Sequence, residues 1–398
     1  YGKAAAEDYD ELIDLGNYVF SAARIPHDFP LLLPKLYRRE YFMEGNHYIV
    51  REEGRVKAIV GTYPLTMNIL GETLPGRGLG MVSVHPYARS RGYMRILMGM
   101  ALEDMCREEA VFSCLGGQRQ RYEYFGYTPT GIRAEFLCGR VNIRHVLATV
   151  PERGKLSLRE IGAGDRELLD RIFDLHRRKA ARIERSREKL FYILSSWNFR
   201  VYAALAGDDF LGYLVCDPSG ERIHEINLKP SPLSPPPPDG SSPPMSRLPE
   251  LIGAFLDLRG RDQVTVAVQP QEREKLDAFS RFAEKYTLTP AYNFRIFDYS
   301  RLLPPLLRLK AQGETLPEGS AVLRISGEGD LRLSVAGGAV SVERVKGNGK
   351  ADMELENREA AETLFSALSP LSSPRLRGNP FLRGILPLPL FFEGPDGI

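Results

Sequence analysis

Hydrophobic residues recur along the chain with two spacings, one typical of helices and one typical of strands. Residues 7–20 place apolar side chains three and four positions apart among acidic ones, which predicts an amphipathic helix. Residues 47–62 alternate around Glu53-Gly54 and predict a strand, a turn and a second strand. A strand over 80–85 then leads through a basic loop into a helix that begins near Gly92. The alternation of both periods predicts an α/β unit.

This order of elements occurs twice, with little residue identity between the copies. The first copy is completed by a strand over 110–115 and a short helix over 118–125. The order indicates a duplicated α/β unit more clearly than any residue match does. In the second copy, helices and strands are expected at 165–178, 201–204, 210–215, 224–228, 248–258, 263–268 and 272–286.

The pattern changes near Phe297, where a third region begins. Three short alternating segments separated by glycine turns predict strands over 321–325, 331–335 and 340–345. Asn357 is a plausible cap for a helix over 358–368. The sequence therefore predicts a mixed α/β (α+β) protein. Its three domains are expected at 1–146, 147–296 and 297–398.

The two copies differ most where the first has its basic glycine loop. At the corresponding place the second copy has a proline-rich loop over 229–245. Proline has no backbone N–H to donate to a phosphate group. We therefore expect the second copy to have lost ligand chemistry and to serve a structural role.

Composition narrows the function classes. Hydrophobic residues make up 43% and charged residues 26% of the 398 residues, as in globular proteins. Lys and Arg number 53 against 51 Asp and Glu, so no global charge favours nucleic acid or a membrane surface. No apolar run approaches the roughly 20 residues of a membrane helix, and no signal peptide pattern opens the chain. These features predict a cytoplasmic protein without membrane insertion.

Cysteine and histidine usage gives little sign of metal chemistry. The four cysteines form no CxxC pair and are expected to be reduced thiols. The six histidines form neither an HxxxH nor an HExxH motif. We therefore expect no metal site.

Residues 81–95 carry the chemistry that the sequence shows most clearly. A strand ends at Pro86, a helix begins near Gly92, and two arginines lie between them. Free N–H groups in the first turn of a helix, a glycine and arginines suit a pyrophosphate. By itself the segment fits equally well a tight turn with solvated arginines. The candidate cofactor-binding residues are Val82, Ser83 and Val84 on the strand, and Arg89, Ser90, Arg91, Gly92, Tyr93 and Met94 in the loop and helix.

Two motifs in the first region resemble those of the GNAT N-acetyltransferase superfamily. Residues 84–94 read Val-x-Pro-x-x-Arg-x-x-Gly-x-Met, which is similar to its acetyl-coenzyme A motif apart from Met94, where a small residue is usual. Residues 122–127, Tyr-Glu-Tyr-Phe-Gly-Tyr, resemble its downstream Tyr-x-x-x-Gly-Phe/Tyr motif. The three-domain order resembles the Eis (enhanced intracellular survival) family. In that family an active GNAT domain is followed by a degenerate GNAT-like domain and a sterol-carrier-protein-like domain.

The resemblance implies direct transfer of an acetyl group from acetyl-CoA to a primary amine. The resemblance assigns Tyr122 as the general acid, and a phenol is protonated at neutral pH as this role requires. Without the resemblance, Tyr122 would be interpreted as an aromatic core residue. Tyr124 and Tyr127 are then expected to be packing residues. In Eis-like enzymes the chain's own terminal carboxylate reaches the first active site, which makes that of Ile398 the candidate base. His85 is the alternative base.

The acceptor stays open between an aminoglycoside-like or other small polyamine and a lysine of a peptide or protein partner. A lipid- or acyl-binding protein with a vestigial transferase site is the alternative function, because the third region resembles a lipid carrier. The resemblance also implies a homo-oligomer, commonly a hexamer in that family. Nothing in the sequence predicts a nucleic-acid partner.

Overall fold

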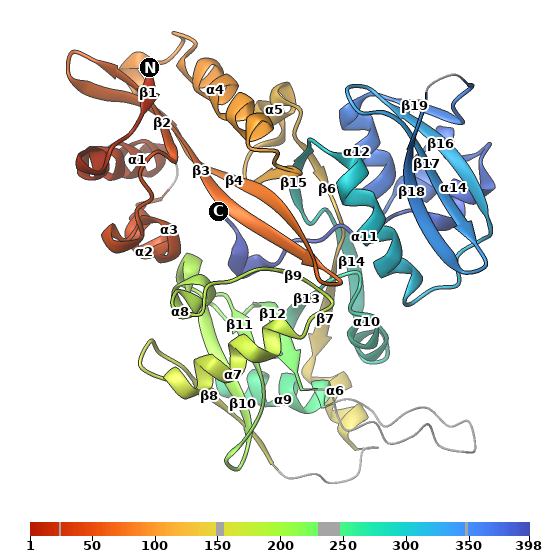
Figure 1. Cartoon of the computed structure of the whole chain (residues 1–398). Coiled ribbons are helices and arrows are strands. Elements are labelled where there is room, and N and C mark those ends of the chain that lie inside the picture. Colours follow the sequence, from red (N-terminus) through yellow and green to blue (C-terminus); the bar gives the residue numbers. More distant parts are fainter. Residues whose placement is uncertain (24, 149–154, 230–246, 347–348) are drawn as a thin grey trace. The chain divides into compact units, whose positions relative to one another are not determined.

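The computed structural model describes residues 1–23, 25–148, 155–229, 247–346 and 349–398 (Figure 1). Within them the chain forms two compact units. The first unit contains residues 1–132, 290–392 and 397–398. The second unit contains residues 133–289 and 393–396. Both units combine helices with mixed sheets, which confirms the predicted α/β fold class.

The main sheet of the first unit is built around a long antiparallel hairpin. Its strand order is β1-β2-β3-β4-β5-β15-β6. The predicted hairpin over 47–62 is confirmed, although its second strand continues to Ile69 and pairs along its length with β4. The strands are β1 (Gly2–Lys3), β2 (His47–Glu52), β3 (Arg55–Ile69), β4 (Glu72–Val84), β5 (Phe112–Leu115), β6 (Thr128–Thr130) and β15 (Tyr292–Ile296).

Helices cover both faces of this sheet. The helix α1 (Tyr9–Ala23) contacts β3 and β4, with Gly16 against the side chain of Met81. The helix α4 (Tyr93–Arg107) packs on the other face, where a buried cluster includes Leu97, Ala101 and the strand residue Leu79. The short helices α2 (Phe29–Leu32) and α3 (Pro34–Tyr37) follow α1.

The second unit repeats this layered plan around its own sheet. The strand order is β14-β7-β13-β12-β11-β10-β8. One face packs on α6 and α9 and the other on α7 and α8. The strands of this sheet are β7 (Arg133–Gly139), β8 (Leu156–Glu160), β10 (Arg200–Ala206), β11 (Asp209–Cys216), β12 (Arg222–Leu228), β13 (Gln263–Val268) and β14 (Lys285–Thr289), while β9 (Ala181–Ile183) belongs to the unit but lies outside the sheet. The helices are α6 (Arg140–Leu147), α7 (Arg166–Arg177), α8 (Leu190–Leu194), α9 (Leu248–Arg259) and α10 (Arg273–Ser280).

The chain crosses from the first unit to the second at Arg133 and returns at Pro290. Both crossings lie inside regions, 1–146 and 147–296, that the sequence predicted to be single domains. The strand β6 pairs with β15 in the first unit, whereas β7, which begins at Arg133, pairs with β13 and β14 in the second. The strand β15 lies between β5 and β6, so each sheet is completed by a strand from a distant part of the sequence. The three-domain division at 146 and 296 stays a prediction.

The remaining part of the first unit forms a smaller sheet with helices. Its four strands have the order β18-β17-β16-β19, and α11 (Tyr299–Ala311) lies against β18. All three predicted strands of this region are present. The strands are β16 (Gly319–Ile325), β17 (Gly329–Ala336), β18 (Ala339–Val345) and β19 (Met353–Leu355), and the further helices are α12 (Asn357–Phe365), α13 (Ser369–Ser372) and α14 (Pro380–Ile385). The likeness of this region to sterol carrier proteins stays a prediction.

Two local predictions were wrong. The helix expected over 272–286 ends at Ser280, and the β-prone residues that follow form β14 instead. Asn357 is the first helical residue of α12, and Glu356 precedes it as the capping residue. The predicted proline-rich loop 229–245 lies, from residue 230 onward, outside the described residues. Within the described residues no helix is both long and apolar enough to cross a membrane.

Candidate functional site

The strand β4 separates from its neighbour β5 near the middle of the sheet. Only Gly76, Arg77 and Gly78 of β4 are in register with β5. Beyond Gly78 no described β5 residue pairs with β4, so the backbone edge of residues 79–84 is open on that side. An open parallel edge offers N–H and C=O groups to an extended ligand.

A β-bulge lies within this open stretch. Ile59 pairs with Ser83 and Gly61 with Gly80, so that Met81 and Val82 together oppose Val60 alone. Met81 has a φ of +49°, in the left-handed region that residues with side chains seldom adopt. A bulge leaves one residue outside the ladder and re-aims its backbone groups, and such backbone strain is typical of functional sites.

The three predicted cofactor-binding residues of the strand, Val82, Ser83 and Val84, lie in this open stretch and differ in their surroundings. Val82 and Val84 pack against the core beneath α4. Ser83 is 1% exposed, and its Oγ has no hydrogen-bond partner among the described residues. A buried unpaired hydroxyl is costly, so it marks a place where a ligand atom would be accommodated.

The loop after β4 leads to an open pocket at the N-terminus of α4. Gly92 precedes α4 with a φ of +78°, and no side chain caps the free N–H groups of the first turn. The pocket measures about 720 Å³. Four of the predicted residues line it, namely Ser90, Arg91, Gly92 and Met94, together with Arg95, Tyr124 and Phe125. Free helix N–H groups and two arginines make it suitable for a phosphorylated ligand.

Two predicted residues of this segment do not line the pocket. Tyr93 is buried, and its hydroxyl donates a hydrogen bond to Glu52. Arg89 is exposed and lies outside the lining. The Arg91 guanidinium pairs with Glu52 at 3.0 Å, and the Tyr93 hydroxyl together with Arg91 holds the pKa of this carboxyl below its usual value. Exposed ion pairs contribute little free energy, so a phosphate can compete for Arg91.

Tyr122 lies at the end of α5 (Arg119–Tyr122), directly before a short 3-10 helix, η4 (Glu123–Phe125). Its ring packs edge-on against Tyr127, with 6.3 Å between ring centroids. A Cβ on Gly117 would lie 2.5 Å from the Tyr122 ring, so the glycine provides the space for it. Burial raises the pKa of Tyr122 to about 12, and the nearby Arg121 only partly offsets this. The phenol therefore remains protonated at neutral pH.

The neighbouring tyrosines take different positions. Tyr127 is 1% exposed and hydrogen-bonds with the Ser113 hydroxyl at 2.7 Å, as expected for a packing residue. Tyr124 was expected to pack as well, but this was wrong. It is 73% exposed and lines the pocket beside α4, because the turn of η4 directs it away from the core.

Ile398 is seated on the strand β4. Its side chain occupies the space above Gly78 and Gly80, and a Cβ on Gly80 would lie 2.7 Å from Cγ2 of Ile398. The Tyr292 hydroxyl donates to the main-chain oxygen of Ile398 at 3.1 Å and accepts from the Ile398 N–H at 3.2 Å. A Cβ on Gly116 would lie 3.4 Å from the same oxygen. Ile398 and Tyr122 thus lie beside the consecutive glycines 116 and 117 at the end of β5.

His85 is engaged in local structure. Its Nδ1 accepts a hydrogen bond from the Tyr87 N–H at 3.3 Å and caps the short 3-10 helix η3 (Pro86–Ala88). Its ring lies 5.6 Å from that of Tyr18. No contact among the described residues links His85 with Tyr122 or Ile398.

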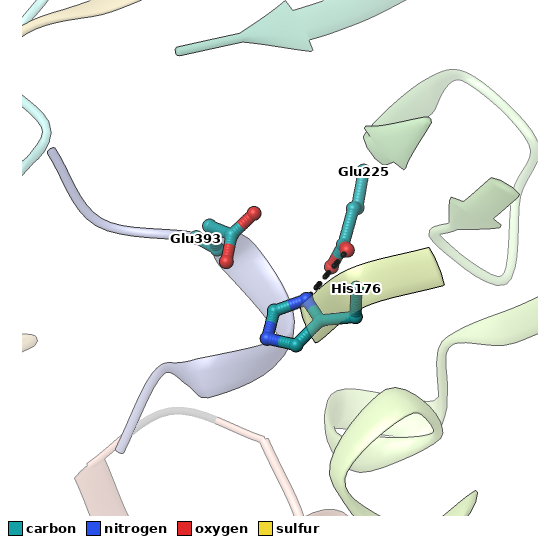
Figure 2. A group of neighbouring side chains, drawn as sticks. All are labelled: His176, Glu225 and Glu393. Atoms are coloured by element: carbon teal, nitrogen blue, oxygen red, sulfur yellow. Dashed lines mark ion pairs between the residues drawn. The ribbon is translucent and has the colours of Figure 1, made fainter. Parts of the chain in front are cut away.

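A second group of ionisable side chains is buried in the second unit (Figure 2). His176 comes from α7, Glu225 from β12 and Glu393 from the segment Glu393–Asp396, and one ligand-type atom of each lies within 4.8 Å of the others. His176 Nε2 lies 2.8 Å from the Ile183 carbonyl, which can only accept, so this nitrogen carries a proton. His176 Nδ1 faces Glu225 at 3.7 Å.

The carboxylates of this group are already neutralised by cations of the chain. Lys179 Nζ lies 3.1 Å from Glu225 Oε1 and also pairs with Glu393, so an ammonium occupies the place that a metal ion would take. Burial opposes ionisation of Glu225, but Arg185 and Lys179 hold its pKa well below the usual range. Burial, together with the Glu225 charge, raises the pKa of Glu393. The group is therefore a compensated charge network.

Comparison with known families bears on the first unit. Residues 1–130 match the model of the acetyltransferase (GNAT) domain. This supports acyl transfer in general as the activity. No curated protein sequence matches the chain.

Solved structures extend the likeness over the whole chain. A GCN5-related N-acetyltransferase from Anabaena variabilis is 17% identical with a TM-score of 0.63, covering 98% of this chain and 97% of that one. One from Kribbella flavida is 18% identical with a TM-score of 0.62, covering 99% and 97%. Eis1 from Mycobacterium abscessus is 14% identical with a TM-score of 0.61, covering 100% and 98%. At these identities the likeness establishes the fold.

Sequence reasoning missed several residues of the site. Arg95, Tyr124 and Phe125 all line the pocket. Arg95 directly follows the motif over 84–94, Tyr124 was assigned to packing, and Phe125 lies in the motif over 122–127 but was given no role. The seat of Ile398 did carry a signal, because β4 has glycine at every second position from 76 to 80. Glycines so spaced share one face of a strand and leave it open to another segment.

Proposed function

We propose that the chain is an N-acetyltransferase that moves an acetyl group from acetyl-CoA to a primary amine by direct attack. The observation that carries the proposal is the convergence, in one GNAT domain, of the β4 bulge, the arginine-lined pocket and Tyr122. An aminoglycoside-like or other small polyamine, or a peptide lysine, is the proposed acceptor class. A cytoplasmic homo-oligomer with a sterol-carrier-like third domain completes the proposal on the basis of sequence resemblance.

The residues present suit acetyl-CoA. The pocket at the N-terminus of α4 supplies Arg91, Arg95 and free N–H groups for the pyrophosphate. The open edge of β4 supplies backbone groups for the extended pantetheine arm. The bulge at Met81 and Val82 places backbone N–H groups outside the ladder, where they would stabilise charge that develops on the thioester carbonyl oxygen.

Tyr122 supplies a proton when the thiolate of CoA leaves. Its phenol is neutral over the physiological range and is set beside the end of β5 by packing on Tyr127. The acceptor amine must lose one proton before or during attack. The Ile398 carboxyl group is the proposed base, and His85 the alternative. The hydrogen bonds of Ile398 with Tyr292 favour the former, since they fix it beside β4 and β5.

Acceptor-dependent release of free thiol from acetyl-CoA tests this function directly. Aminoglycosides, polyamines and lysine peptides would be compared as acceptors. We expect thiol release with at least one class, in step with formation of the acetylated amine. Absence of release with every acceptor, despite measurable CoA binding, would favour an acyl-binding protein with a vestigial site.

Arg91→Ala tests the pyrophosphate site. A charge-assisted hydrogen bond contributes about 1.5–3 kcal/mol, so we expect the KM for acetyl-CoA to rise roughly 10-fold or more while kcat stays nearly constant. Arg107→Ala is the matched control, because Arg107 is exposed at the other end of α4 and pairs with Asp104. An equal rise in both variants would argue against a specific phosphate contact at Arg91.

The pH dependence tests the raised pKa of Tyr122. With a pKa of about 12, the phenol stays protonated while an amine acceptor with a pKa of ~10 loses its proton. We therefore expect kcat/KM to rise with pH and to show no decline up to about pH 10, since the acid remains in its active form. A decline centred near pH 9, with the protein still folded, would contradict Tyr122 as an acid of raised pKa.

A further inference from the structure

The pocket at the N-terminus of α4 is lined by two unlike kinds of side chain. Arg91 and Arg95 supply positive charge beside the free N–H groups of the helix. Tyr124 and Phe125 supply two aromatic rings. Phosphate groups explain the arginines and the free N–H groups, but they give the rings no role. A ligand that suits the whole pocket has an apolar, flat part next to its phosphates.

Arg95 indicates where the phosphates would lie. Its Nη2 lies 3.9 Å from the position that a Cβ on Gly92 would take, at the start of α4. Within the described ranges Arg95 forms no hydrogen bond or ion pair. A guanidinium without a partner at the positive end of a helix dipole is unfavourable by itself, and a bound anion relieves this. The anionic part of the ligand is therefore expected at the start of α4, within the pocket that Tyr124 lines.

The ring of Tyr124 is exposed, yet the turn that carries it is fixed. Tyr124 is 73% exposed and packs edge-on against Phe125, with 5.3 Å between ring centroids. Arg295 of β15 donates a hydrogen bond to the Phe125 carbonyl. The turn closes where the Gly126 N–H donates to the Glu123 carbonyl at 3.0 Å. A ring on a fixed turn loses little conformational freedom when a ligand covers it.

Tyr122 and Tyr124 lie on the same helical turn but face different surroundings. Residues of a 3-10 helix are rotated by about 120° from one to the next, so residues two apart point in different directions. The Tyr122 ring packs against Tyr127 and lies beside Gly117 at the end of β5, whereas Tyr124 lines the pocket. In CoA the pyrophosphate separates the pantetheine arm, which ends in the thiol, from the adenosine. Tyr122 thus suits the thioester end, and Tyr124 suits the nucleotide end.

We propose that Tyr124 stacks on the adenine ring of CoA and makes binding depend on the nucleotide half of the cofactor. The inference rests on the proposed function for the identity of the ligand. A purine has an extended π-face, and stacking of a base on an aromatic side chain changes affinity by about 10-fold or more. The hydroxyl has no part in such a contact, so the ring alone accounts for the effect.

Calorimetric binding tests the inference without any turnover. Tyr124→Ala removes the ring, and Tyr124→Phe keeps it. The matched control is Tyr286→Ala, which removes a 66% exposed ring from the second unit. We expect Tyr124→Ala to raise the Kd for CoA about 10-fold and to leave the Kd for phosphopantetheine, which lacks the adenosine, unchanged. Tyr124→Phe and the control should bind both ligands as the native chain does. An equal loss for both ligands, or native CoA affinity in Tyr124→Ala, would overturn the inference.

Etheno-CoA, in which the adenine is fluorescent, reports stacking directly. Its fluorescence is quenched when the base stacks on an aromatic ring. We expect quenching at saturation with the native chain and Tyr124→Phe, and its loss with Tyr124→Ala. Quenching that persists in Tyr124→Ala would overturn the inference even if the affinity falls. A native chain that binds CoA but transfers no acetyl group would refute the proposed function, and these binding measurements would still decide the role of Tyr124. A native chain without measurable CoA binding would overturn both.

Discussion

Tyr122→Phe is expected to lower kcat for acetyl transfer by about 100-fold or more, which is the usual size of a general-acid effect. The variant keeps the ring that packs against Tyr127 at 6.3 Å. No described residue hydrogen-bonds with the Tyr122 hydroxyl, so its removal leaves no unpaired partner. The free energy of unfolding and the KM for acetyl-CoA should therefore stay nearly constant. Thiol-release kinetics and thermal unfolding measure both quantities.

A matched control is available in Tyr286→Phe, which removes a hydroxyl from a 66% exposed tyrosine of the second unit. We expect native kinetics from it. The assignment also predicts that acetyl thioester donors whose leaving thiol has a lower pKa depend less on Tyr122, because a better leaving group needs less protonation. A Tyr122→Phe protein with native turnover would show that water or another group protonates the thiolate.

Gly78→Ala is expected to have the second large effect, because the added methyl group overlaps with Cδ1 of Ile398. Displacing a group in a reacting site by about 1 Å can cost about 100-fold, and we expect a loss of that order in kcat. Ile398→Val removes the same Cδ1 atom and by itself should change kcat only slightly. Combining the two substitutions removes the direct overlap and leaves Cγ1 of residue 398 at 3.0 Å from the new methyl group, so the double variant should recover a large part of the native kcat.

Gly99→Ala controls for the addition of a methyl group. Gly99 lies within α4, and its Cβ would meet no atom within 4 Å. This variant should keep native kinetics and gain about 1 kcal/mol of stability from better helix propensity. If the double variant at 78 and 398 is as impaired as Gly78→Ala alone, the loss comes from distortion of β4, and the seat of Ile398 has no part in it.

Local patterns predicted the parts of the first unit that depend on neighbours in sequence. The hairpin of β2 and β3 followed from alternation around Glu53-Gly54. The turn from β4 into α4 followed from Gly92, whose φ of +78° suits glycine. The pocket there confirms that the loop residues Ser90, Arg91 and Met94 lie together. Their role in binding acetyl-CoA stays a prediction.

Pairings between distant residues were not predictable in the same way. Nothing in the alternation of β7 or β15 specifies which sheet each strand joins. The position of Ile398 depends on Gly78, about 320 residues earlier, and on Tyr292, and periodicity carries no such information. The buried network of Arg185, Glu225 and Asp396 was missed for the same reason, because charged residues far apart in sequence are ordinarily assigned to the surface.

The position of β15 in the first sheet has a consequence for synthesis of the protein on the ribosome. The first sheet contains β15 between β5 and β6, and β15 spans Tyr292–Ile296. A ribosome adds roughly 5–20 residues per second, so the first 132 residues exist for many seconds before the strand that joins β5 to β6 has been made. During this interval β5 and β6 expose unpaired backbone edges of the kind that promote aggregation. Residues 1–132 are thus translated before residues 133–289, yet the sheet that they form is completed only afterwards, when β15 has been made.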